Sequence, residues 1–182
     1  MGRRPRQPAY LGKVDRESGC GFSGSNQPGN SVDPSITEGF LFSASVIHPD
    51  LIQAYLETNF HVRSEKPFVL RIGELTAEIN SLHQTKQVDS SCFITSCNPE
   101  SKQLSQVENR TRLHELKSDK SLQDFELVEG LGQHPTNAWE GEESFLVLGI
   151  SLAKASEVGR KYDQNAIVWI DTDAIPQLIL LR

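Results

Sequence analysis

The spacing of hydrophobic positions predicts a regular alternation of helices and strands from Val46 to the end of the chain. Apolar residues three or four positions apart indicate helices with one buried face, and short runs rich in Val, Ile and Phe indicate strands. The predicted helices cover residues 49–58, 75–84, 106–118 and 152–162. The predicted strands cover residues 60–62, 68–72, 92–95, 125–128, 145–150, 166–170 and 177–181.

Local signals support these boundaries. Ser105 precedes Glu108 by three positions, which is the capping-box pattern of a helix that begins just after the serine. On that helix we expect Val107 and Leu116 to face the core. Residues 145–150 form a continuous apolar run, which is typical of a strand covered on both faces of its sheet.

The order of the elements favours an α/β or α+β fold class. We expect a two-layer or three-layer sandwich with a mixed sheet of about six or seven strands. The strands at 60–62 and 68–72 are expected to pair as a hairpin. The connection at residues 171–174 is short, so the last two strands should be antiparallel, because parallel neighbours need a longer crossover. An all-parallel sheet is therefore the weaker alternative.

The beginning of the chain differs in composition from the rest. Residues 1–39 hold 7 of the 13 glycines and 4 of the 9 prolines, and such a segment cannot bury enough apolar surface to fold. We predict that residues 1–39 are disordered and that residues 46–182 form a single domain. Arg3, Arg4 and Arg6 are not followed by the apolar stretch of a secretion signal.

Charge and hydropathy narrow the classes of partner. The chain has 18 basic and 24 acidic residues and a formal net charge of −6, so it lacks the general positive field that nucleic-acid binding requires. Its longest apolar stretch, residues 145–153, is far shorter than the roughly 20 residues that cross a bilayer. We expect a soluble protein that binds neither nucleic acid nor membrane.

The cysteines and histidines do not suggest a metal or a cofactor. Cys20, Cys92 and Cys97 are an odd number, which disfavours a disulfide framework and favours a cytoplasmic location. Cys92 and Cys97 have no second cysteine pair, and the five histidines are scattered without metal-binding spacing. We predict neither a metal site nor a bound cofactor.

Two junctions, one from a strand into a helix and one from a helix into a strand, are candidates for a polar site. Asn98, Ser101 and Ser105 lie between a predicted strand and a helix N-terminus, where anions bind readily. The alternative is that Asn98 makes a local turn and Ser105 only caps the helix. Gln164 and Asn165 precede a buried strand, and they either line a pocket or satisfy backbone carbonyls.

A third candidate is the predicted loop at residues 130–143. Its glycines do not complete the dinucleotide-binding fingerprint, and they precede a strand instead of a helix. Glu142 and Glu143 are adjacent, so in an extended chain they point to opposite faces and only one of them serves a given pocket. Trp139 either stacks on a flat ligand or packs on the edge of the sheet.

Several separated segments carry a family resemblance in the same order. They comprise Ala54, Tyr55 and Thr58, residues 68–73, Thr95, Asn98, Pro99, Leu104, Ser105, Asn109, Arg112, Gly130, Gly132, Trp139, residues 142–144, residues 147–150, Gly159, Arg160 and residues 164–167. From about Ala54 to the C-terminus the chain resembles an uncharacterised bacterial family, the domain of unknown function 3293. Ser96-Cys97 and Gly141 depart from the pattern. The resemblance implies no activity, because none is assigned to the family.

We hypothesise that six polar side chains converge on a cleft for a small anionic or nucleotide-like ligand. These candidate ligand-binding residues are Arg71, Asn98, Asn109, Arg112, Glu143 and Gln164. One alternative is a hydrolase or transferase with Glu143 as general base and His134 or Arg112 supporting charge. The other is a protein-interaction or regulatory module, which would expose a large apolar patch and enclose no cavity.

Overall fold

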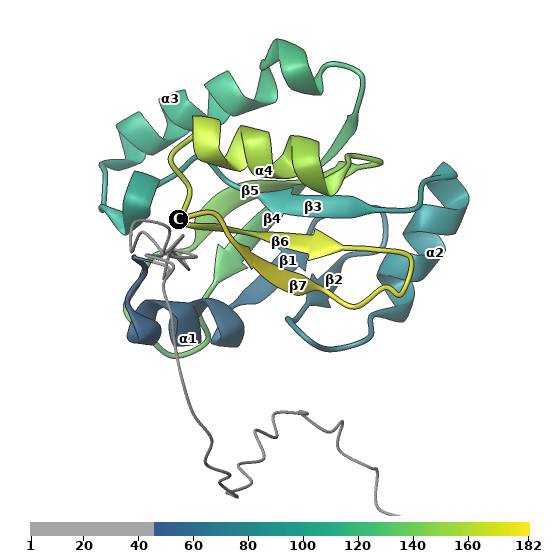
Figure 1. The fold of residues 1–182 in the computed structure, drawn as a ribbon, viewed down its shortest axis with the longest axis horizontal. Coiled ribbons are helices and arrows are strands. Elements are labelled where there is room, and N and C mark those ends of the chain that lie inside the picture. The colour runs from purple at the N-terminus through teal and green to yellow at the C-terminus, as the bar shows by residue number, and fades with distance from the viewer. Residues whose placement is uncertain (1–45) are drawn as a thin grey trace, which may run out of the picture. The chain divides into compact units, whose positions relative to one another are not determined.

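Residues 46–182 form a curled sheet with helices on both of its faces (Figure 1). The computed structural model describes these residues, so the predicted disordered segment, residues 1–39, lies outside the described part of the chain. The α-helices of the described part are α1 (Pro49–Glu57), α2 (Ala77–Lys86), α3 (Gln106–Lys117) and α4 (Leu152–Lys161), and the short 3-10 helices are η1 (Pro99–Ser101) and η2 (Lys120–Leu122). The strands are β1 (Asn59–Val62), β2 (Phe68–Leu70), β3 (Ser91–Ile94), β4 (Glu126–Gln133), β5 (Glu142–Leu148), β6 (Ala166–Ile170) and β7 (Gln177–Leu180).

Within residues 46–182 the sheet has seven strands, in the order β2-β1-β4-β5-β3-β6-β7. The predicted hairpins β1–β2 and β6–β7 are confirmed, and so is the α+β class. The mixed sheet is a correction, because all six pairings are antiparallel. The crossover through α3 joins β3 to β4, and the crossover through α4 joins β5 to β6. In each case the two joined strands are parallel, but one antiparallel strand lies between them. The hydrophobic pattern does not reveal that inserted strand.

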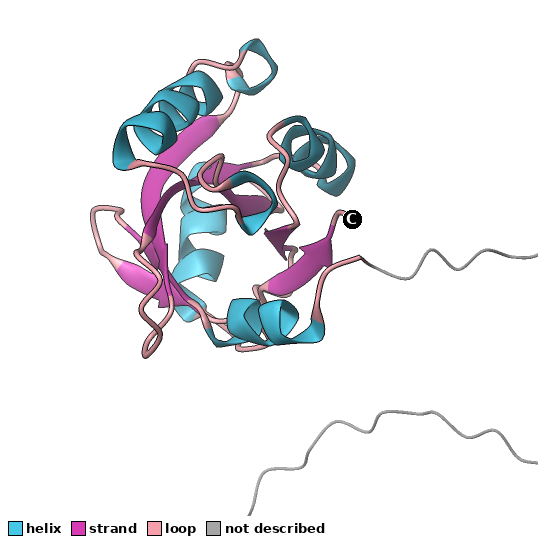
Figure 2. Cartoon of the chain, turned by 90° about the vertical axis from the view of Figure 1, so that its left-hand side faces the viewer, coloured by secondary structure: helices cyan, strands magenta, loops and turns pink. Residues whose placement is uncertain are grey.

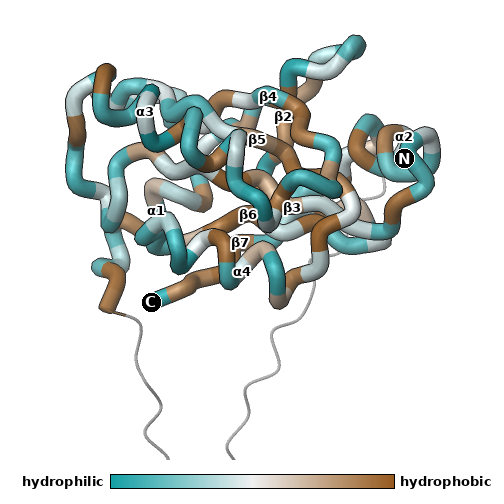
Figure 3. Tube along the Cα trace, turned by 90° about the horizontal axis from the view of Figure 1, so that it is seen from above, coloured by the Kyte–Doolittle hydropathy of each residue, from teal (hydrophilic) through white to brown (hydrophobic). Residues whose placement is uncertain are grey.

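Alternate residues of the central strands build two cores, one on each face. On β5, Phe145 and Val147 pack under α3 and α4, whereas Leu146 and Leu148 pack against α2. Figure 2 shows the sheet curling around α2. Figure 3 shows that α3 is mostly hydrophilic along its length. Its buried residue is Leu116, which packs in the same core as Phe145 and Val147. Because both faces are covered, the long apolar run of β5 is accounted for.

Three sequence predictions differ from the structure. The helix α2 begins at Ala77, so Leu75 lies before it and is 72% exposed. Val107 is 69% exposed and does not face the core. The glycine pair at 130 and 132 lies inside β4 instead of a loop, which reduces the connection between β4 and β5 to residues 134–141.

A glycine is required at position 130 by packing. A Cβ atom there would lie 2.5 Å from Cε2 of Phe93 and 2.8 Å from the carbonyl oxygen of His61. Glycine in a sequence usually indicates a turn, but within a strand it also permits close approach of a neighbouring group. Here the neighbour is an aromatic ring on β3, which only the tertiary structure brings close.

None of the helices in residues 46–182 combines the length and the apolar character needed to cross a membrane.

Candidate functional site

One end of the sheet contains a cavity of about 170 Å³. The ends of β3 and β4 meet the beginnings of β5 and β6 there, and α1 lies beside them (Figure 1). The cavity opens on the face of the sheet that α2 also covers, because Phe60, Phe93 and Val168 belong to both the cavity wall and that core. Further apolar wall residues are Leu51, Ala54, Ile94, Ala166, Ile167 and Leu178. The cavity is comparable in size to one of about 150 Å³ that holds a benzene molecule.

Glu142 brings a carboxylate to this cavity. Its Oε1 accepts hydrogen bonds from Nδ2 of Asn98 at 2.6 Å and from Nε1 of Trp139 at 3.0 Å. Burial raises the pKa of Glu142, and the two hydrogen bonds only partly offset this effect. The other oxygen, Oε2, accepts no hydrogen bond from any residue between 46 and 182. A half-buried carboxylate with a spare acceptor oxygen can receive a hydrogen-bond donor from a ligand.

The side chain of Asn98 is held in a fixed orientation. Its Oδ1 accepts from the backbone N–H of Leu104 and from Nδ2 of Asn109, both at 2.9 Å. Its own backbone N–H donates to Oδ1 of Asn109 at 2.9 Å. The backbone of Asn98 is left-handed, with φ of 44°, a conformation that asparagine tolerates better than most residues. These contacts orient the Asn98 amide toward Glu142 without the help of a ligand.

The short helix η1 brings further polar atoms to the cavity wall. Glu100 and Ser101 also have positive φ values, 54° and 58°, so this turn stores backbone strain. The hydroxyl groups of Ser101 and Tyr55 are 2.7 Å apart, and Nδ2 of Asn165 donates to both. These contacts fasten α1 to the turn after β3. Tyr55 and Ser101 line the cavity, whereas Asn165 does not.

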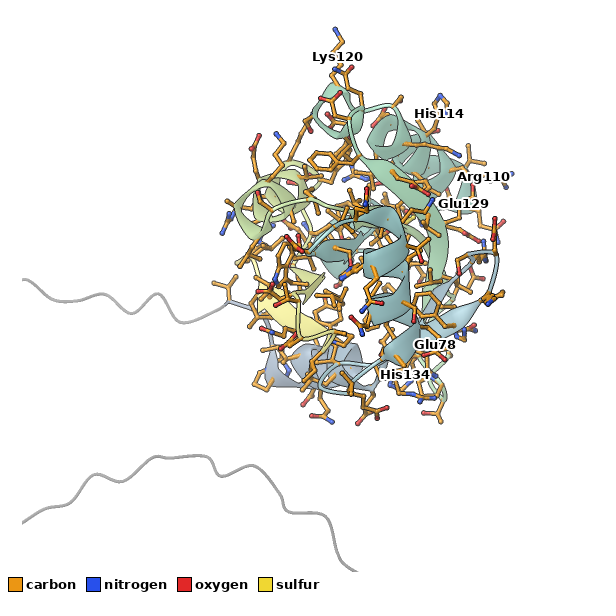
Figure 4. All side chains as sticks on the ribbon, turned by 90° about the vertical axis from the view of Figure 1, so that its right-hand side faces the viewer. Glu78, Arg110, His114, Lys120, Glu129 and His134 are labelled. Atoms are coloured by element: carbon orange, nitrogen blue, oxygen red, sulfur yellow. The ribbon has the colours of Figure 1, made fainter. Side chains whose placement is uncertain are left out.

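His134 closes the cavity on the side of the 134–141 connection. Its Nδ1 accepts the backbone N–H groups of Thr136 and Asn137, at 3.2 and 3.0 Å, so the proton of the neutral ring is assigned to Nε2. That Nε2 donates to Glu57 on α1 at 3.1 Å. Figure 4 shows His134 at the end of the domain opposite Lys120. The imidazole is thus used to hold the connection against α1.

A second hollow, of about 340 Å³, lies on the other side of Glu142, and we call it the groove. It is bordered by the α3 residues Gln106, Asn109, Arg110 and Leu113, by Cys97, Asn98, Gln103 and Leu104, and by residues 139–143. Asn98, Trp139 and Glu142 line both the cavity and the groove. They therefore form the partition between the two hollows.

The six residues predicted from the sequence do not line one cleft. Asn98 and Gln164 line the cavity, and Asn98, Asn109 and Glu143 line the groove. Gln164 uses its Nε2 to donate to the carbonyl oxygens of Cys97 and Tyr162, at 3.0 and 3.2 Å. Of its two predicted roles, the satisfaction of backbone carbonyls is therefore observed directly.

Arg71 and Arg112 line neither hollow. Arg71 donates to Oδ1 of Asn59 at 3.0 Å on the exposed surface. Arg112 donates from Nε to the carbonyl oxygen of Ser96 at 2.7 Å and from Nη2 to that of Tyr162 at 2.9 Å. These two hydrogen bonds join the segment after β3 to the residue after α4, so the guanidinium group of Arg112 has a structural role.

Glu143 faces away from the cavity. Its carboxylate accepts two hydrogen bonds from Arg63, at 2.8 and 3.2 Å, and both side chains are about half exposed. Sequence reasoning recognised that only one of the two glutamates serves a given pocket, but it selected Glu143. The signal that identifies Glu142 is the period of two along β5, since Glu142 shares its face with Leu146 and Leu148.

Comparison with known proteins gives a family but no activity. Residues 94–167 match the model of a family described as a protein of unknown function, DUF3293. No curated protein and no solved structure matches the chain. The matched region contains Asn98, Trp139, Glu142 and Gln164, whereas α1 and the hairpin β1–β2 lie before it. Residues 94–167 are therefore similar to the protein family of unknown function DUF3293, in agreement with the resemblance that the sequence indicated.

Proposed function

We propose that this chain binds a small molecule that has an apolar, ring-sized body and a hydrogen-bond-donating nitrogen, such as an amine. The observation that carries the proposal is the carboxylate of Glu142 at the edge of an apolar cavity. The apolar body would occupy the cavity, and the nitrogen would donate to Glu142. Sites of this kind, mostly apolar with a few placed polar groups, are typical of small-molecule binding.

The size of the cavity argues against a nucleotide. Pockets for drug-sized ligands usually have volumes of about 300–1,000 Å³, and this cavity has about 170 Å³. A single aromatic ring fits within the cavity, whereas a base, a sugar and a phosphate together would extend beyond it. The nucleotide-like ligand predicted from the sequence is therefore replaced in our proposal by a smaller one.

The charge of the lining argues against an anion. Among the residues that the structure describes, no lysine or arginine lines the cavity, and Glu142 is its one carboxylate. An anionic ligand would meet a like charge where water screens it poorly. An ammonium group would instead stabilise the ionised form of Glu142, and a hydrogen bond to a charged group contributes about 1.5–3 kcal/mol. The lining therefore favours a cationic or neutral donor.

The test uses benzylamine and benzoate, which share a ring and carry opposite charges. In ligand-observed NMR titrations we expect benzylamine to bind at least tenfold tighter than benzoate, which corresponds to about 1.4 kcal/mol. Glu142→Gln should remove this preference. Glu143→Gln, which makes the same change one residue further along β5, should keep it. Equal binding of the two compounds, or equal effects of the two substitutions, would overturn the proposal.

The natural ligand can be sought directly. Native mass spectrometry of the purified chain would reveal a small molecule that survives purification. We expect the retained mass to be lost from Glu142→Gln and kept by Glu143→Gln. A retained polyanion such as a nucleotide would contradict the proposal.

A hydrolase or transferase is the second candidate function, and the raised pKa of Glu142 favours it. A carboxyl group with a raised pKa in a cavity suits general acid–base catalysis. The base suggested by the sequence, Glu143, is already paired with Arg63. Turnover of the retained small molecule by the wild type and by Glu143→Gln, but not by Glu142→Gln, would establish the enzymatic function.

An interaction module receives less support from the surface. The large hydrophobic side chains that are exposed are spread over the described part of the chain: among them, Leu56 lies on α1, Leu75 before α2, Val107 on α3 and Leu152 on α4. Isolated exposed apolar residues are normal on protein surfaces.

We also propose a cytoplasmic location, and the free thiols of Cys92 and Cys97 suit a reducing compartment. Fractionation of cells that express the chain would test this location.

A further inference from the structure

We infer that the cavity and the groove form one two-part binding site, whose ligand has a cationic tail in addition to the ring-sized body. This inference rests on the proposed function and extends it from a ring with an amine to an elongated molecule with a second amine. The observation is that Asn98, Trp139 and Glu142 line both hollows. A ligand nitrogen bound at Glu142 would therefore lie at the junction between them.

The partition depends on hydrogen bonds to a single oxygen atom. Asn98 and Trp139 both donate to Oε1 of Glu142. The side chain of Asn98 is fixed by Leu104 and Asn109, so its position does not depend on Glu142 alone. The indole of Trp139 has no other side-chain hydrogen bond within residues 46–182, and 37% of its surface is exposed.

Trp139 is accordingly the part of the partition that can move. A ligand amine offers Glu142 a charged donor in place of the neutral indole N–H, and hydrogen bonds to charged groups are the stronger kind. The lost Trp139 bond has a net value of only about 1 kcal/mol. Trp139 also lies on a connection without regular secondary structure, between His134 and Gly141. Its displacement would open the cavity into the groove.

The chemistry of the groove specifies the tail. Of the described residues, Glu140, Glu142 and Glu143 bring carboxylates to the groove, and Arg110 brings a guanidinium. Glu143 is already paired with Arg63, so the carboxylates of Glu140 and Glu142 remain against one guanidinium. This excess of one negative charge favours a positively charged chain. The volume of the cavity alone is below the usual range for small-molecule sites, whereas the two hollows together fall within that range of about 300–1,000 Å³.

The experiment compares two ligands that differ only at the end of the tail. N-benzyl-1,4-diaminobutane carries a terminal amine, and 4-(benzylamino)butanoic acid carries a carboxylate at the end of a chain of similar length. In calorimetric titrations we expect the diamine to bind at least tenfold tighter than the amino acid. We also expect it to bind at least threefold tighter than benzylamine, and to change the fluorescence of the wild type but not of Trp139→Phe.

Charge reversal in the groove supplies the matched control. Glu140→Lys should abolish the preference for the diamine over the amino acid. Glu65→Lys makes the same change in net charge at an exposed position outside both hollows, and it should keep the preference.

The two proposals fail in different ways. If benzylamine binds and the diamine gains nothing, or if Glu140→Lys and Glu65→Lys behave alike, the two-part site is wrong and the proposed function stands. If benzylamine itself does not bind, the proposed function is wrong and the two-part site is wrong with it.

Discussion

Asn98 and Asn109 hydrogen-bond to each other twice, once through the backbone N–H of Asn98 and once between their side-chain amides, with both distances 2.9 Å. This double contact joins the turn after β3 to α3, although the two asparagines are eleven positions apart in the sequence. It also sets the orientation of the amide that donates to Glu142. The candidate site is thus built on contacts between elements and not on one sequence motif.

The first prediction concerns this pair. Asn109→Ala leaves the N–H of Asn98 without its acceptor, and an unsatisfied buried donor costs about 1–3 kcal/mol. We expect a loss of this size in the free energy of unfolding, measured by urea denaturation. Gln106→Ala, at an exposed position of the same helix, should cost less than about 0.5 kcal/mol. Equal losses in the two variants would show that the Asn98–Asn109 contact contributes nothing.

The second prediction concerns the glycines of β4. In Gly130→Ala the new methyl group collides with Phe93 and with a backbone carbonyl, and overpacking of this kind typically costs about 1–3 kcal/mol. Because Phe93 is also a wall of the cavity, benzylamine binding should weaken in the same variant. In Gly132→Ala the nearest atom is 3.7 Å from the new methyl group, so we expect little change in the thermal midpoint. The prediction fails if both variants melt at the same temperature.

The third prediction concerns pH and His83. His83 belongs to α2, and its Nε2 lies 2.8 Å from Oγ of Ser91 on β3. Burial lowers the pKa of His83 below the usual 6.5, although Asp89 and Asp171 partly oppose this. The unfolded chain therefore takes up a proton more readily than the folded one, so the free energy of unfolding should fall as the pH decreases below about 6.5.

Denaturation curves recorded across this pH range check the assignment. The decline should be smaller in His83→Gln, because that variant has no imidazole to protonate. It should persist in His114→Gln, which removes an imidazole from the outer surface of α3 (Figure 4). A decline of the same size in His83→Gln would mean that other groups cause it.

The fourth prediction concerns Asp119. Burial alone would raise the pKa of this carboxyl, but hydrogen bonds from Lys161, Ser121 and Tyr162 outweigh it and hold the pKa far below 3.8. Asp119→Asn should destabilise the fold at pH 7 by an amount on the order of 1–3 kcal/mol, since it breaks the 2.6 Å contact with Lys161.

The dependence on pH distinguishes this contribution. A lowered folded pKa stabilises the fold above pH 3.8, and this contribution is lost as the pH falls further. The difference between wild type and Asp119→Asn should therefore shrink below that pH. Asp124→Asn, at an exposed position, should match the wild type throughout. A constant difference at all pH values would contradict the assignment.

The sequence predicts the elements of the fold well because their causes are local. The capping box of α3 forms as expected, with Ser105 accepting from Glu108 N–H and the Glu108 carboxylate accepting in return. The alternation of helices and strands is likewise confirmed. The all-antiparallel order of the sheet was not predictable, because it depends on which strand inserts between two others.

The candidate site is less predictable, because its causes are tertiary. Arg112 looks like an anion-binding residue in the sequence, but two carbonyl oxygens occupy its guanidinium group. Glu142 and Glu143 are chemically identical, and the assignment of residues 130–143 to a loop concealed the two-residue period that separates them. Recognising that Glu143 pairs with Arg63 requires the contact between two distant segments.

A crystal structure of the chain grown with benzylamine tests the central claim most directly. We predict that the ring lies among Phe60, Phe93 and Val168, with the ammonium nitrogen within hydrogen-bond distance of the Glu142 carboxylate. Benzylamine bound outside the cavity, or an ammonium nitrogen paired with Glu143 while the cavity contains only solvent, would contradict the account.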